Sequence, residues 1–352
     1  MKTILITVPT LLPGGMERAA VNFAEVLANK GFKVHLFLIS SSDVFYEIPT
    51  NVLIFFGKKN LKKKWQTPYS LWRLRKHVRL IKPDYVLSFS GKISSYIILA
   101  LTGLPTTVVP FHRGSPYKTY GWFNNVLNEL LFPKCKALVV QTNVAKVIFE
   151  KKFKNRNIIV VPNPVRKLNL NPEVPKKNFI LAVSRLVDGK GLDRLIKIFA
   201  NIDPAGWELI IVGDGPSRNK LEKLIASLGM TDKVKLEGFK KDVDQFFSQS
   251  SIFAFTSESE GFPNSLLEAM CSGNACISFD CPTGPAEMIK DGINGYLIPL
   301  TSDGLYEEKL RHLIEDKHLR ELFGERAKQL NIAHSPQNVL DNFVDMLISK
   351  TS

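Results

Sequence analysis

The sequence has few cysteines, no long apolar run and no cleavable leader pattern, and each shortage excludes a class of protein. The four cysteines among its 352 residues form no C-x-x-C pair, which disfavours a disulfide framework or a zinc site; they are Cys135, Cys271, Cys276 and Cys281. No stretch reaches the roughly 18–20 apolar residues that span a bilayer. Residues 1–15 lack a small-residue cleavage site and favour a strand followed by a glycine loop. We therefore expect a cytoplasmic protein with buried thiols.

Acidic residues are also scarce, but only in one half of the chain. Residues 1–170 hold 26 Lys and Arg against 7 Asp and Glu, a net charge of +19, whereas the remainder is mildly acidic and the whole chain carries +14. Such asymmetry indicates an anionic partner for the first half, either nucleic acid or an anionic membrane surface. The length favours two domains, because one core rarely serves more than about 250–300 residues.

Apolar runs alternate with helical patterns along both halves. Residues 4–8 form a short apolar run that is followed by a Pro-Gly-Gly loop, a helical pattern from Met16 to Lys30 and a second apolar run at residues 33–39. This order predicts a βαβ unit and a parallel sheet. A second such series begins at Phe179, after a Pro- and Asn-rich linker at residues 165–178. We expect an α/β protein with two doubly wound, Rossmann-like domains, residues 1–168 and 169–332, facing across a cleft.

The segment EGFPNSLLEAMCS, residues 260–272, carries two carboxylates eight positions apart around a turn that opens a helix. The free N–H groups of Asn264, Ser265 and Leu266 at that helix start favour an anion. Carboxylates beside it accept hydrogen bonds from hydroxyl groups. A site that suits phosphate and hydroxyls together is suited to a sugar nucleotide, with Glu260 and Glu268 as acceptors.

Further candidate residues follow predicted strands, where ligands of such sheets bind. Arg185 and Lys190 come after one strand and are suited to a diphosphate, although loop cations are more often simply solvated. Asp214 follows the next strand and accepts either from a ligand or from a helix start. Phe239 lies in a turn that could meet a nucleobase.

In the first half, the loop with Gly14 and Gly15 lets the backbone approach a ligand, and His112 lies at another strand end. Asp242 and Asp244 match the D-x-D pattern by which some sugar transferases hold a divalent ion. Asp242 precedes a helical stripe, however, where an aspartate is an ordinary N-cap. We expect no metal site.

A basic segment at residues 58–82 contains a helical pattern in which apolar and cationic residues alternate. A cationic amphipathic helix with tryptophan is suited to an anionic membrane surface. Its apolar side equally suits packing on the sheet, with the charges solvated. The candidate acceptor or membrane residues are Trp72, Arg73, Arg75, Lys76 and Arg79.

Taken in order, these motifs resemble glycosyltransferase family 4, the retaining transferases of the GT-B fold. The resemblance rests on Gly14–Gly15, SRL…KG at 184–191, GDGP at 213–216, EGFPNSLLEAM at 260–270 and CPTGPAEMI at 281–289. It covers almost the whole chain, and the Glu-x7-Glu block is its most specific part.

The resemblance implies a role for each candidate. Glu260 would contact hydroxyls of the donor sugar, and Glu268 the ribose. Arg185 and Lys190 would hold the diphosphate, and His112 would face the sugar. The remaining donor-site residues are Gly14, Gly15, Ser184, Asp214, Phe239, Gly261, Phe262, Pro263, Asn264, Ser265 and Leu266. The family's last helix usually crosses back, so residues 333–352 are expected on the first domain, and no metal or cofactor is expected.

We therefore expect a retaining transferase that moves a hexose or N-acetylhexosamine from a UDP-linked donor to a lipid-linked glycan, in surface polysaccharide or glycoprotein assembly. It would lie peripherally on the inner face of the cell membrane. A soluble acceptor is the nearer alternative. A basic nucleic-acid-binding protein is the alternative from another class, although no nucleic-acid-binding motif is present.

Overall fold

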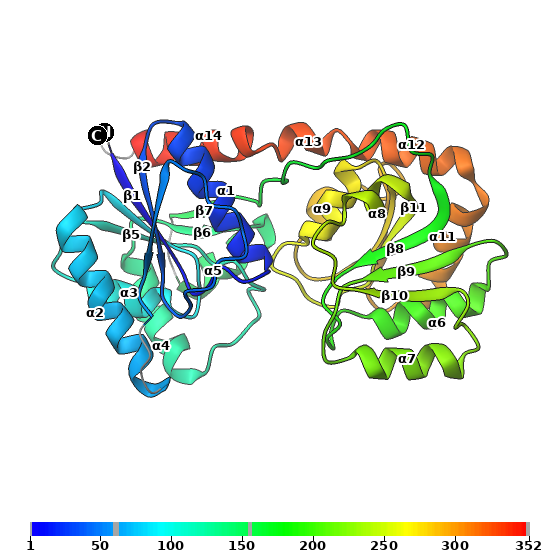
Figure 1. Cartoon of the computed structure of the whole chain (residues 1–352), viewed down its shortest axis with the longest axis horizontal. Helices are drawn as coiled ribbons and strands as arrows, with labels where there is room; N and C mark the ends of the chain where they lie inside the picture. Colours follow the sequence, from blue (N-terminus) through cyan, green and yellow to red (C-terminus); the bar gives the residue numbers. More distant parts are fainter. Residues whose placement is uncertain (1, 59–62, 154–156, 350–352) are drawn as a thin grey trace. The chain divides into compact units, whose positions relative to one another are not determined.

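The computed structural model describes residues 2–58, 63–153 and 157–349, and the chain divides into two compact units (Figure 1). Unit 1 consists of Met1–Pro164 together with Pro336–Ser352, and unit 2 of Val165–Ser335. The sequence placed these divisions four residues later, at 168, and three residues earlier, at 333. Each unit has its own parallel sheet and its own cores, so each is described separately.

Unit 1 is built on a five-stranded parallel sheet in the order β3-β2-β1-β4-β5. The strands are β1 (Thr3–Val8), β2 (Lys33–Leu38), β3 (Val52–Phe56), β4 (Tyr85–Ser88) and β5 (Thr107–Pro110). This is the doubly wound order that the βαβ pattern predicted. The strand β3 was not predicted from the sequence. Two further strands, β6 (Leu138–Val140) and β7 (Ile158–Val160), pair with each other, and an isolated parallel bridge links Val139 to Phe111, just after β5.

Helices cover both faces of the unit 1 sheet. On one face α1 (Gly15–Asn29) and α14 (Pro336–Ser349) pack together, with Phe23 and Phe343 in one core. On the other face lie α2 (Lys63–Ile81) and α3 (Ser94–Leu101). The unit also contains α4 (Trp122–Leu131), a 3₁₀ turn (Phe132–Lys134) and α5 (Asn143–Phe153). The helix α14 therefore belongs to the core of unit 1, although unit 2 precedes it in the sequence.

Unit 2 is built on a six-stranded parallel sheet in the order β10-β9-β8-β11-β12-β13. The strands are β8 (Lys177–Val183), β9 (Glu208–Val212), β10 (Val234–Gly238), β11 (Ser250–Phe255), β12 (Ala275–Asp280) and β13 (Tyr296–Pro299). The helices are α6 (Leu192–Ile202), α7 (Arg218–Ser227), α8 (Asp244–Gln249), α9 (Asn264–Cys271), α10 (Pro285–Met288), α11 (Asp303–Glu315), α12 (Lys317–Ala327) and α13 (Leu330–Ala333). Two cores, one on each face, bury this sheet.

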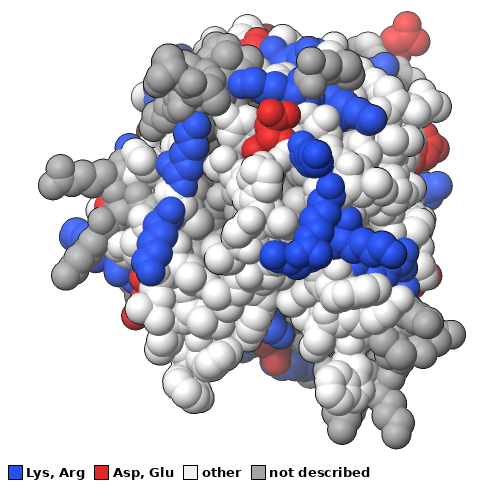
Figure 2. All heavy atoms as spheres, turned by 90° about the vertical axis from the view of Figure 1, so that its left-hand side faces the viewer, with Lys and Arg blue, Asp and Glu red and all other residues white. Residues whose placement is uncertain are grey.

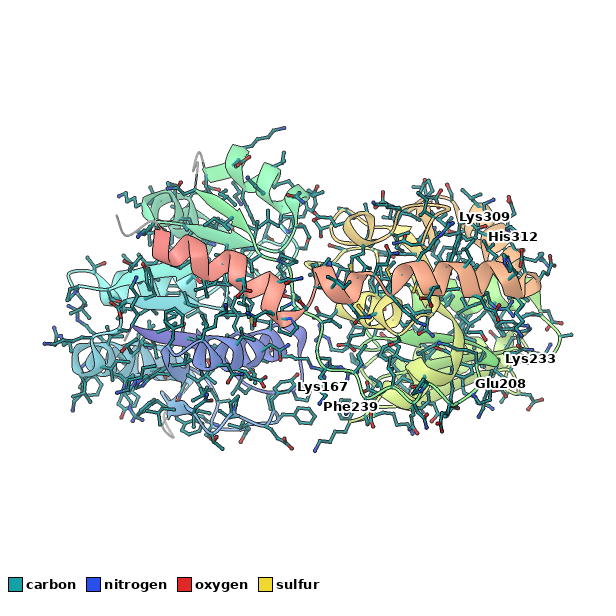
Figure 3. The ribbon with its side chains drawn as sticks, turned by 90° about the horizontal axis from the view of Figure 1, so that it is seen from above. Lys167, Glu208, Lys233, Phe239, Lys309 and His312 are labelled. Atoms are coloured by element: carbon teal, nitrogen blue, oxygen red, sulfur yellow. The ribbon has the colours of Figure 1, made fainter. Side chains whose placement is uncertain are left out.

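All strands of the unit 2 sheet are parallel, so their amino ends lie along one edge of the sheet and their carboxyl ends along the opposite edge. Glu208 opens β9 and Lys233 precedes β10, and both lie at one edge, whereas Phe239, which follows β10, lies at the other (Figure 3). The strand order reverses direction between β8 and β11, which are neighbours in the sheet. Ligands of doubly wound sheets bind beyond the carboxyl ends at such a switch point. Within the described part of the chain, no helix is long and apolar enough to cross a membrane.

Candidate active site

The two strands at the switch point of unit 2 carry a cation and a carboxylate that meet. Lys190 lies in the loop after β8, and Glu260 in the loop after β11. The Lys190 Nζ donates a hydrogen bond to Glu260 Oε1 at 2.6 Å, and the two side chains are only 20% and 14% exposed. Two residues that the sequence assigned to one site, 70 positions apart, are therefore in direct contact.

The backbone around this pair is held closely. The Thr256 hydroxyl donates to the Lys190 carbonyl oxygen at 3.0 Å, and the Thr283 hydroxyl donates to the Glu260 carbonyl oxygen. Gly191 has a φ of +64°, and a Cβ there would lie 2.2 Å from the Thr256 carbonyl oxygen. Only glycine fits that position, because any side chain would strike backbone. The geometry of the pair is therefore set by the scaffold and not by two flexible loops.

The loop after β9 packs against the loop after β8. Gly213 has a φ of +143°, and a Cβ there would lie 1.8 Å from the Ser184 carbonyl oxygen. The Leu186 N–H donates to the Asp214 carbonyl oxygen at 3.0 Å, and the Asp214 side chain accepts from the Gly215 N–H at 2.7 Å. Asp214 thus holds the N–H of the next residue in its own turn, whereas the sequence had offered the start of the following helix, α7, as its structural partner.

Arg185 and Phe239 are two of the exposed residues of the predicted donor site, together with Gly15 and Asp214. Arg185 and Phe239 both follow strands of the unit 2 sheet, β8 and β10. Phe239 is 55% exposed. No ion pair of the Arg185 guanidinium is found among the residues that the structure describes. A solvated guanidinium and an exposed ring at one edge of the sheet remain accessible to a ligand.

The turn that opens α9 is buried under the loop after β12. Phe262 and Pro263 are both buried, and a Cβ at Gly284 would lie 2.3 Å from the Pro263 Cδ. The Asn264 N–H donates to the Phe262 carbonyl oxygen at 3.1 Å. The sequence predicted a free N–H at Asn264, and this prediction is wrong. By helix geometry, the remaining N–H donors of the first turn are those of Ser265 and Leu266.

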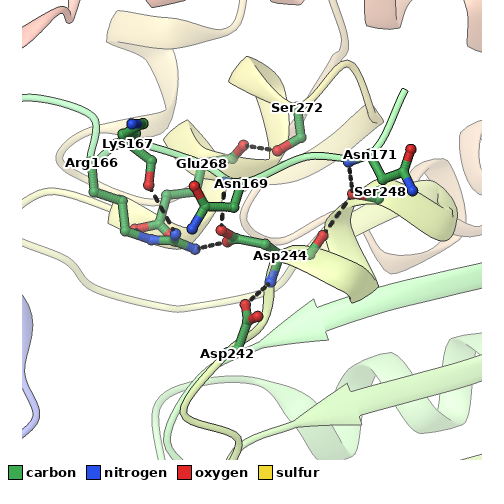
Figure 4. A network of polar contacts seen from close by, with 9 residues as sticks. All are labelled: Arg166, Lys167, Asn169, Asn171, Asp242, Asp244, Ser248, Glu268 and Ser272. Carbon is green, nitrogen blue, oxygen red and sulfur yellow. Dashed lines mark hydrogen bonds and ion pairs between the residues drawn. The ribbon is translucent and has the colours of Figure 1, made fainter. Parts of the chain in front are cut away.

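Glu268, the second carboxylate of the Glu-x7-Glu block, is buried and paired with Arg166 (Figure 4). The Arg166 Nε lies 3.2 Å from Glu268 Oε1, and its Nη2 contacts Asp244 Oδ1. Asp244 also accepts from the Asn169 N–H at 2.7 Å. Sequence reasoning missed Arg166 because it lies at the start of the segment interpreted as a linker. The one available signal was a lone arginine next to an apolar residue, Val165, in a polar segment.

The D-x-D pair has structural partners. The Asp242 side chain accepts from the Asp244 N–H at 2.9 Å, but the N-cap of α8 is Val243 and not Asp242 as the sequence predicted. Asp244 is committed to Arg166. Across the described residues, no group of three His, Cys, Asp or Glu is placed to hold a metal ion.

The three cysteines of unit 2, Cys271, Cys276 and Cys281, are buried and carry free thiols. Burial raises the pKa of Cys271 and of Cys281 to about 12. Thiols in such surroundings remain protonated and unreactive. The fourth cysteine, Cys135, is half-buried in unit 1.

Unit 1 contains the other predicted site residues. Gly14 donates its N–H to the Tyr46 hydroxyl at 2.8 Å and accepts from that hydroxyl at 2.9 Å, and Gly15 begins α1. His112 follows β5 and is buried, with its ring 4.5 Å from that of Phe149. Burial lowers the pKa of His112 to about 4, so its imidazole is neutral at neutral pH.

The basic helix α2 packs one side on the sheet and exposes cations on the other. Its buried side, with Leu74 and Val78, packs on the sheet. Arg75 donates to the Thr102 carbonyl oxygen at 3.0 Å, so this cation anchors α2 to the end of α3. Trp72 is 58% exposed, with the Lys76 Nζ 5.9 Å from its ring centre. The exposed cations of the predicted set are Arg73, Lys76 and Arg79.

Comparison with known families gives two matches that meet end to end. The model described as "Glycosyltransferase Family 4" matches residues 13–167, and the one described as "Glycosyl transferases group 1" matches residues 167–330. Together they span residues 13–330, which is most of both units.

Similar proteins cover nearly the full length of the chain. It is 29% identical over 344 residues to the amylovoran biosynthesis glycosyltransferase AmsD of Erwinia amylovora, covering 95% of this chain and 96% of that protein. It is 26% identical to a 4-alpha-N-acetylgalactosaminyltransferase of Campylobacter jejuni named for a diphospho-undecaprenol substrate, covering 93% and 94%. The crystal structure of Alr3699/HepE from Anabaena in complex with UDP has a similar fold, with a TM-score of 0.82 at 19% identity, covering 99% and 100%.

Proposed function

The chain belongs to glycosyltransferase family 4, and from that premise we propose a retaining enzyme that moves a hexose or N-acetylhexosamine from a UDP-linked donor to a hydroxyl of a lipid-linked glycan. The observation that carries this proposal is the contact between Lys190 and Glu260 at the switch point of the unit 2 sheet. A carboxylate and a cation there meet the two requirements of a sugar nucleotide, hydroxyl groups and a diphosphate.

Charge development in the reaction explains the residue types. As the bond between the anomeric carbon and the phosphate oxygen breaks, negative charge grows on the leaving diphosphate. Lys190 and Arg185 would stabilise that charge, together with the first-turn donors of α9. Glu260 would hold sugar hydroxyls through the carboxylate oxygen that does not face Lys190, and Glu268 would accept from the ribose.

The proposed stereochemistry is retention by attack on the same face. The acceptor hydroxyl attacks the anomeric carbon as the diphosphate leaves, and its proton passes to the departing phosphate oxygen. A double displacement through a covalent glycosyl-enzyme needs a carboxylate free to attack carbon. Glu260 is paired with Lys190 and Glu268 with Arg166. The neutral His112 would hydrogen-bond to the sugar, and the reaction would need no metal.

The acceptor is proposed from chemistry and from relatives. One relative is named for a diphospho-undecaprenol substrate, and a second for biosynthesis of the polysaccharide amylovoran. A lipid-linked acceptor presents its sugar at a membrane surface, which suits the +19 net charge of residues 1–170. We therefore place the enzyme peripherally on the inner face of the cell membrane, with Arg73, Lys76 and Arg79 among the attracting cations.

The decisive experiment is transfer by the purified full chain with a panel of UDP-sugars and undecaprenyl-diphosphate-linked acceptors. We expect one donor to release UDP faster when an acceptor is added, and we expect the new linkage to have the donor's anomeric configuration by NMR. The Glu260→Gln variant should lose transfer by about 100-fold or more, since it weakens an interaction made with the transition state. Lys220→Met, which breaks an exposed ion pair with Asp188, is the matched control.

Three results would each contradict part of the proposal. Inverted product would exclude the same-face mechanism. Unchanged transfer by Glu260→Gln would remove the site. Transfer to soluble glycans at the same rate as to lipid-linked ones would favour the soluble-acceptor alternative.

A further inference from the structure

The helix α4 of unit 1 exposes its apolar side. Trp122, Val126 and Leu130 are spaced four residues apart, so they line one face of the helix, and Phe123 lies beside them. They are 78%, 44%, 58% and 51% exposed in the order Trp122, Val126, Leu130, Phe123. A surface helix normally turns such a stripe towards the core. Here the stripe is turned outward, and Tyr117 and Leu99 add two more exposed apolar side chains, from the preceding loop and from α3.

The side of α4 that faces the protein carries a buried asparagine between the half-buried Leu127 and Leu131. Asn128 is its buried residue, and it accepts from the Ser95 hydroxyl and donates to the Gly91 carbonyl oxygen at 3.2 Å. These bonds fix the rotation of the helix about its axis. Turning the apolar stripe inward would break both hydrogen bonds of Asn128. The outward stripe is therefore built into the fold.

Basic residues lie beside this apolar surface. In Figure 1, α4 lies at the lower edge of unit 1, and Figure 2 is turned about the vertical axis, so the same edge is at its lower side. On the face that Figure 2 shows, the lower part of the described surface carries few charges, and most of the Lys and Arg residues lie above it in separate groups. Lys118 and Lys134, just before and just after α4, are exposed.

We infer that the apolar face of α4 inserts into the headgroup region of an anionic bilayer and anchors the enzyme there. Tryptophan and phenylalanine favour the headgroup region. A helix of ten residues is far too short to cross the bilayer, so we place α4 in the plane of the membrane. Lysines beside the apolar face suit anionic headgroups. A second copy of the chain fits less well, because docking two copies by this face would bring two basic surfaces together.

The position of α4 connects this anchor with the candidate site in unit 1. The chain from His112 to Trp122 is a single loop, and Tyr120 in that loop has its ring 6.0 Å from the His112 ring. Gly91, which Asn128 holds, packs against the same imidazole: a Cβ there would lie 2.7 Å from His112 Cδ2. A helix seated in the bilayer would thus hold His112 close to the surface from which a lipid-linked acceptor is presented. This link rests on the proposed function, whereas the anchor itself does not.

The test is flotation of the full chain with phosphatidylglycerol-containing vesicles, without donor or acceptor. The double variant Trp122→Ser/Phe123→Ser removes the apolar contact and leaves the Lys and Arg residues unchanged. Ile332→Ser removes an equally exposed apolar side chain in unit 2 and is the control. We expect the double variant to bind vesicles at least 10-fold more weakly and the control to bind as the wild type does. Wild-type tryptophan fluorescence should also shift to the blue with vesicles, and the shift should shrink in the double variant.

Raising the salt concentration separates the apolar contribution from charge attraction, which salt screens. Residual wild-type binding at 0.5 M salt that is absent from the double variant would support insertion. Equal vesicle binding by wild type and double variant would overturn the inference, as would a wild-type dimer that the double variant dissociates. UDP-sugar hydrolysis or transfer, measured on the same preparations, reports on the proposed function separately.

Discussion

Arg166 and Glu268 form a buried ion pair between the segment that opens unit 2 and the helix α9. The Arg166 side chain is 18% exposed and that of Glu268 is 9%, and the same guanidinium contacts the still more deeply buried Asp244. One cation thus neutralises two carboxylates from different helices (Figure 4). The carboxylate assigned to the ribose is therefore oriented by a residue outside the Glu-x7-Glu block.

Replacing Arg166 by methionine should destabilise unit 2 strongly. The variant leaves Asp244 and Glu268 buried without their shared cation, and removing one partner of a buried pair costs about 3–5 kcal/mol. The measurement is the free energy of unfolding from urea titrations followed by circular dichroism. Lys220→Met removes an exposed pair with Asp188 and should cost about 0–1 kcal/mol. Similar losses in the two variants would show that Arg166 is not needed to neutralise the buried carboxylates.

Lys190 and Glu260 should behave as one unit in catalysis. Because their side chains touch, Lys190→Met and Glu260→Gln should not have additive effects on the free energy of activation. In a double-mutant cycle based on kcat/KM, we expect the double variant to raise the free energy of activation by less than the sum of the two single variants. The expected difference is about 0.5–3 kcal/mol. Strict additivity would mean that the two residues act on different parts of the substrate or on none.

Gly213 should not tolerate a side chain. Its φ of +143° is costly for any other residue, and the new Cβ would lie 1.8 Å from the Ser184 carbonyl oxygen. We expect Gly213→Ala to lower the free energy of unfolding by more than about 2 kcal/mol. Gly304→Ala is the matched control. A Cβ there meets nothing within 4 Å, so the melting temperature should be unchanged or slightly higher.

Acid should weaken unit 1 through His35. This residue of β2 is 2% exposed, and its ring stacks on Phe55 at 5.4 Å and lies 5.5 Å from that of His77 in α2. Burial lowers the pKa of His35 to about 4 and also lowers the pKa of His77. As the pH falls below about 6.5, the unfolded chain takes up protons that the folded chain refuses, so stability is lost between pH 6.5 and 4.

The expected loss at His35 is roughly 2–3 kcal/mol, because each pKa unit is worth about 1.4 kcal/mol. Urea titrations at pH 7 and pH 4.5 on the wild type and on His35→Leu measure it. Part of the drop should persist in His35→Leu, since His112 titrates in the same window. His318→Gln, at an exposed histidine, should follow the wild type. An identical pH dependence in His35→Leu would rule out this histidine as a source of acid sensitivity.

The sequence predicted most of the fold because periodicity is a local signal. The βαβ order is local, and so is the Gly-Phe-Pro-Asn turn, which the structure places at the start of α9. The missed strand β3 is a five-residue run beside a basic segment, and β6 and β7 have the same pattern as the strands of the main sheet. Which strands pair depends on long-range contacts that no local pattern encodes.

The same limit applies to the site. Lys190 and Glu260 were found because each follows a strand, and parallel strands end at one edge of a sheet. Arg166 was not found, since its partners lie 78 and about 100 residues away in two helices. The outward stripe of α4 was also missed: the sequence shows that the helix is two-sided but not which side the protein covers.

The helix α14 has a consequence for how the protein is made. Its residues Val339, Leu340, Phe343 and Val344 belong to the core of the first unit, yet the ribosome adds them after the whole of the second. During synthesis, residues 165–335 have every side chain of their own cores before residues 1–164 do. Unit 2, although it is encoded later, can therefore complete its cores first. The core of unit 1 beside α1 is completed only when α14 has been synthesised.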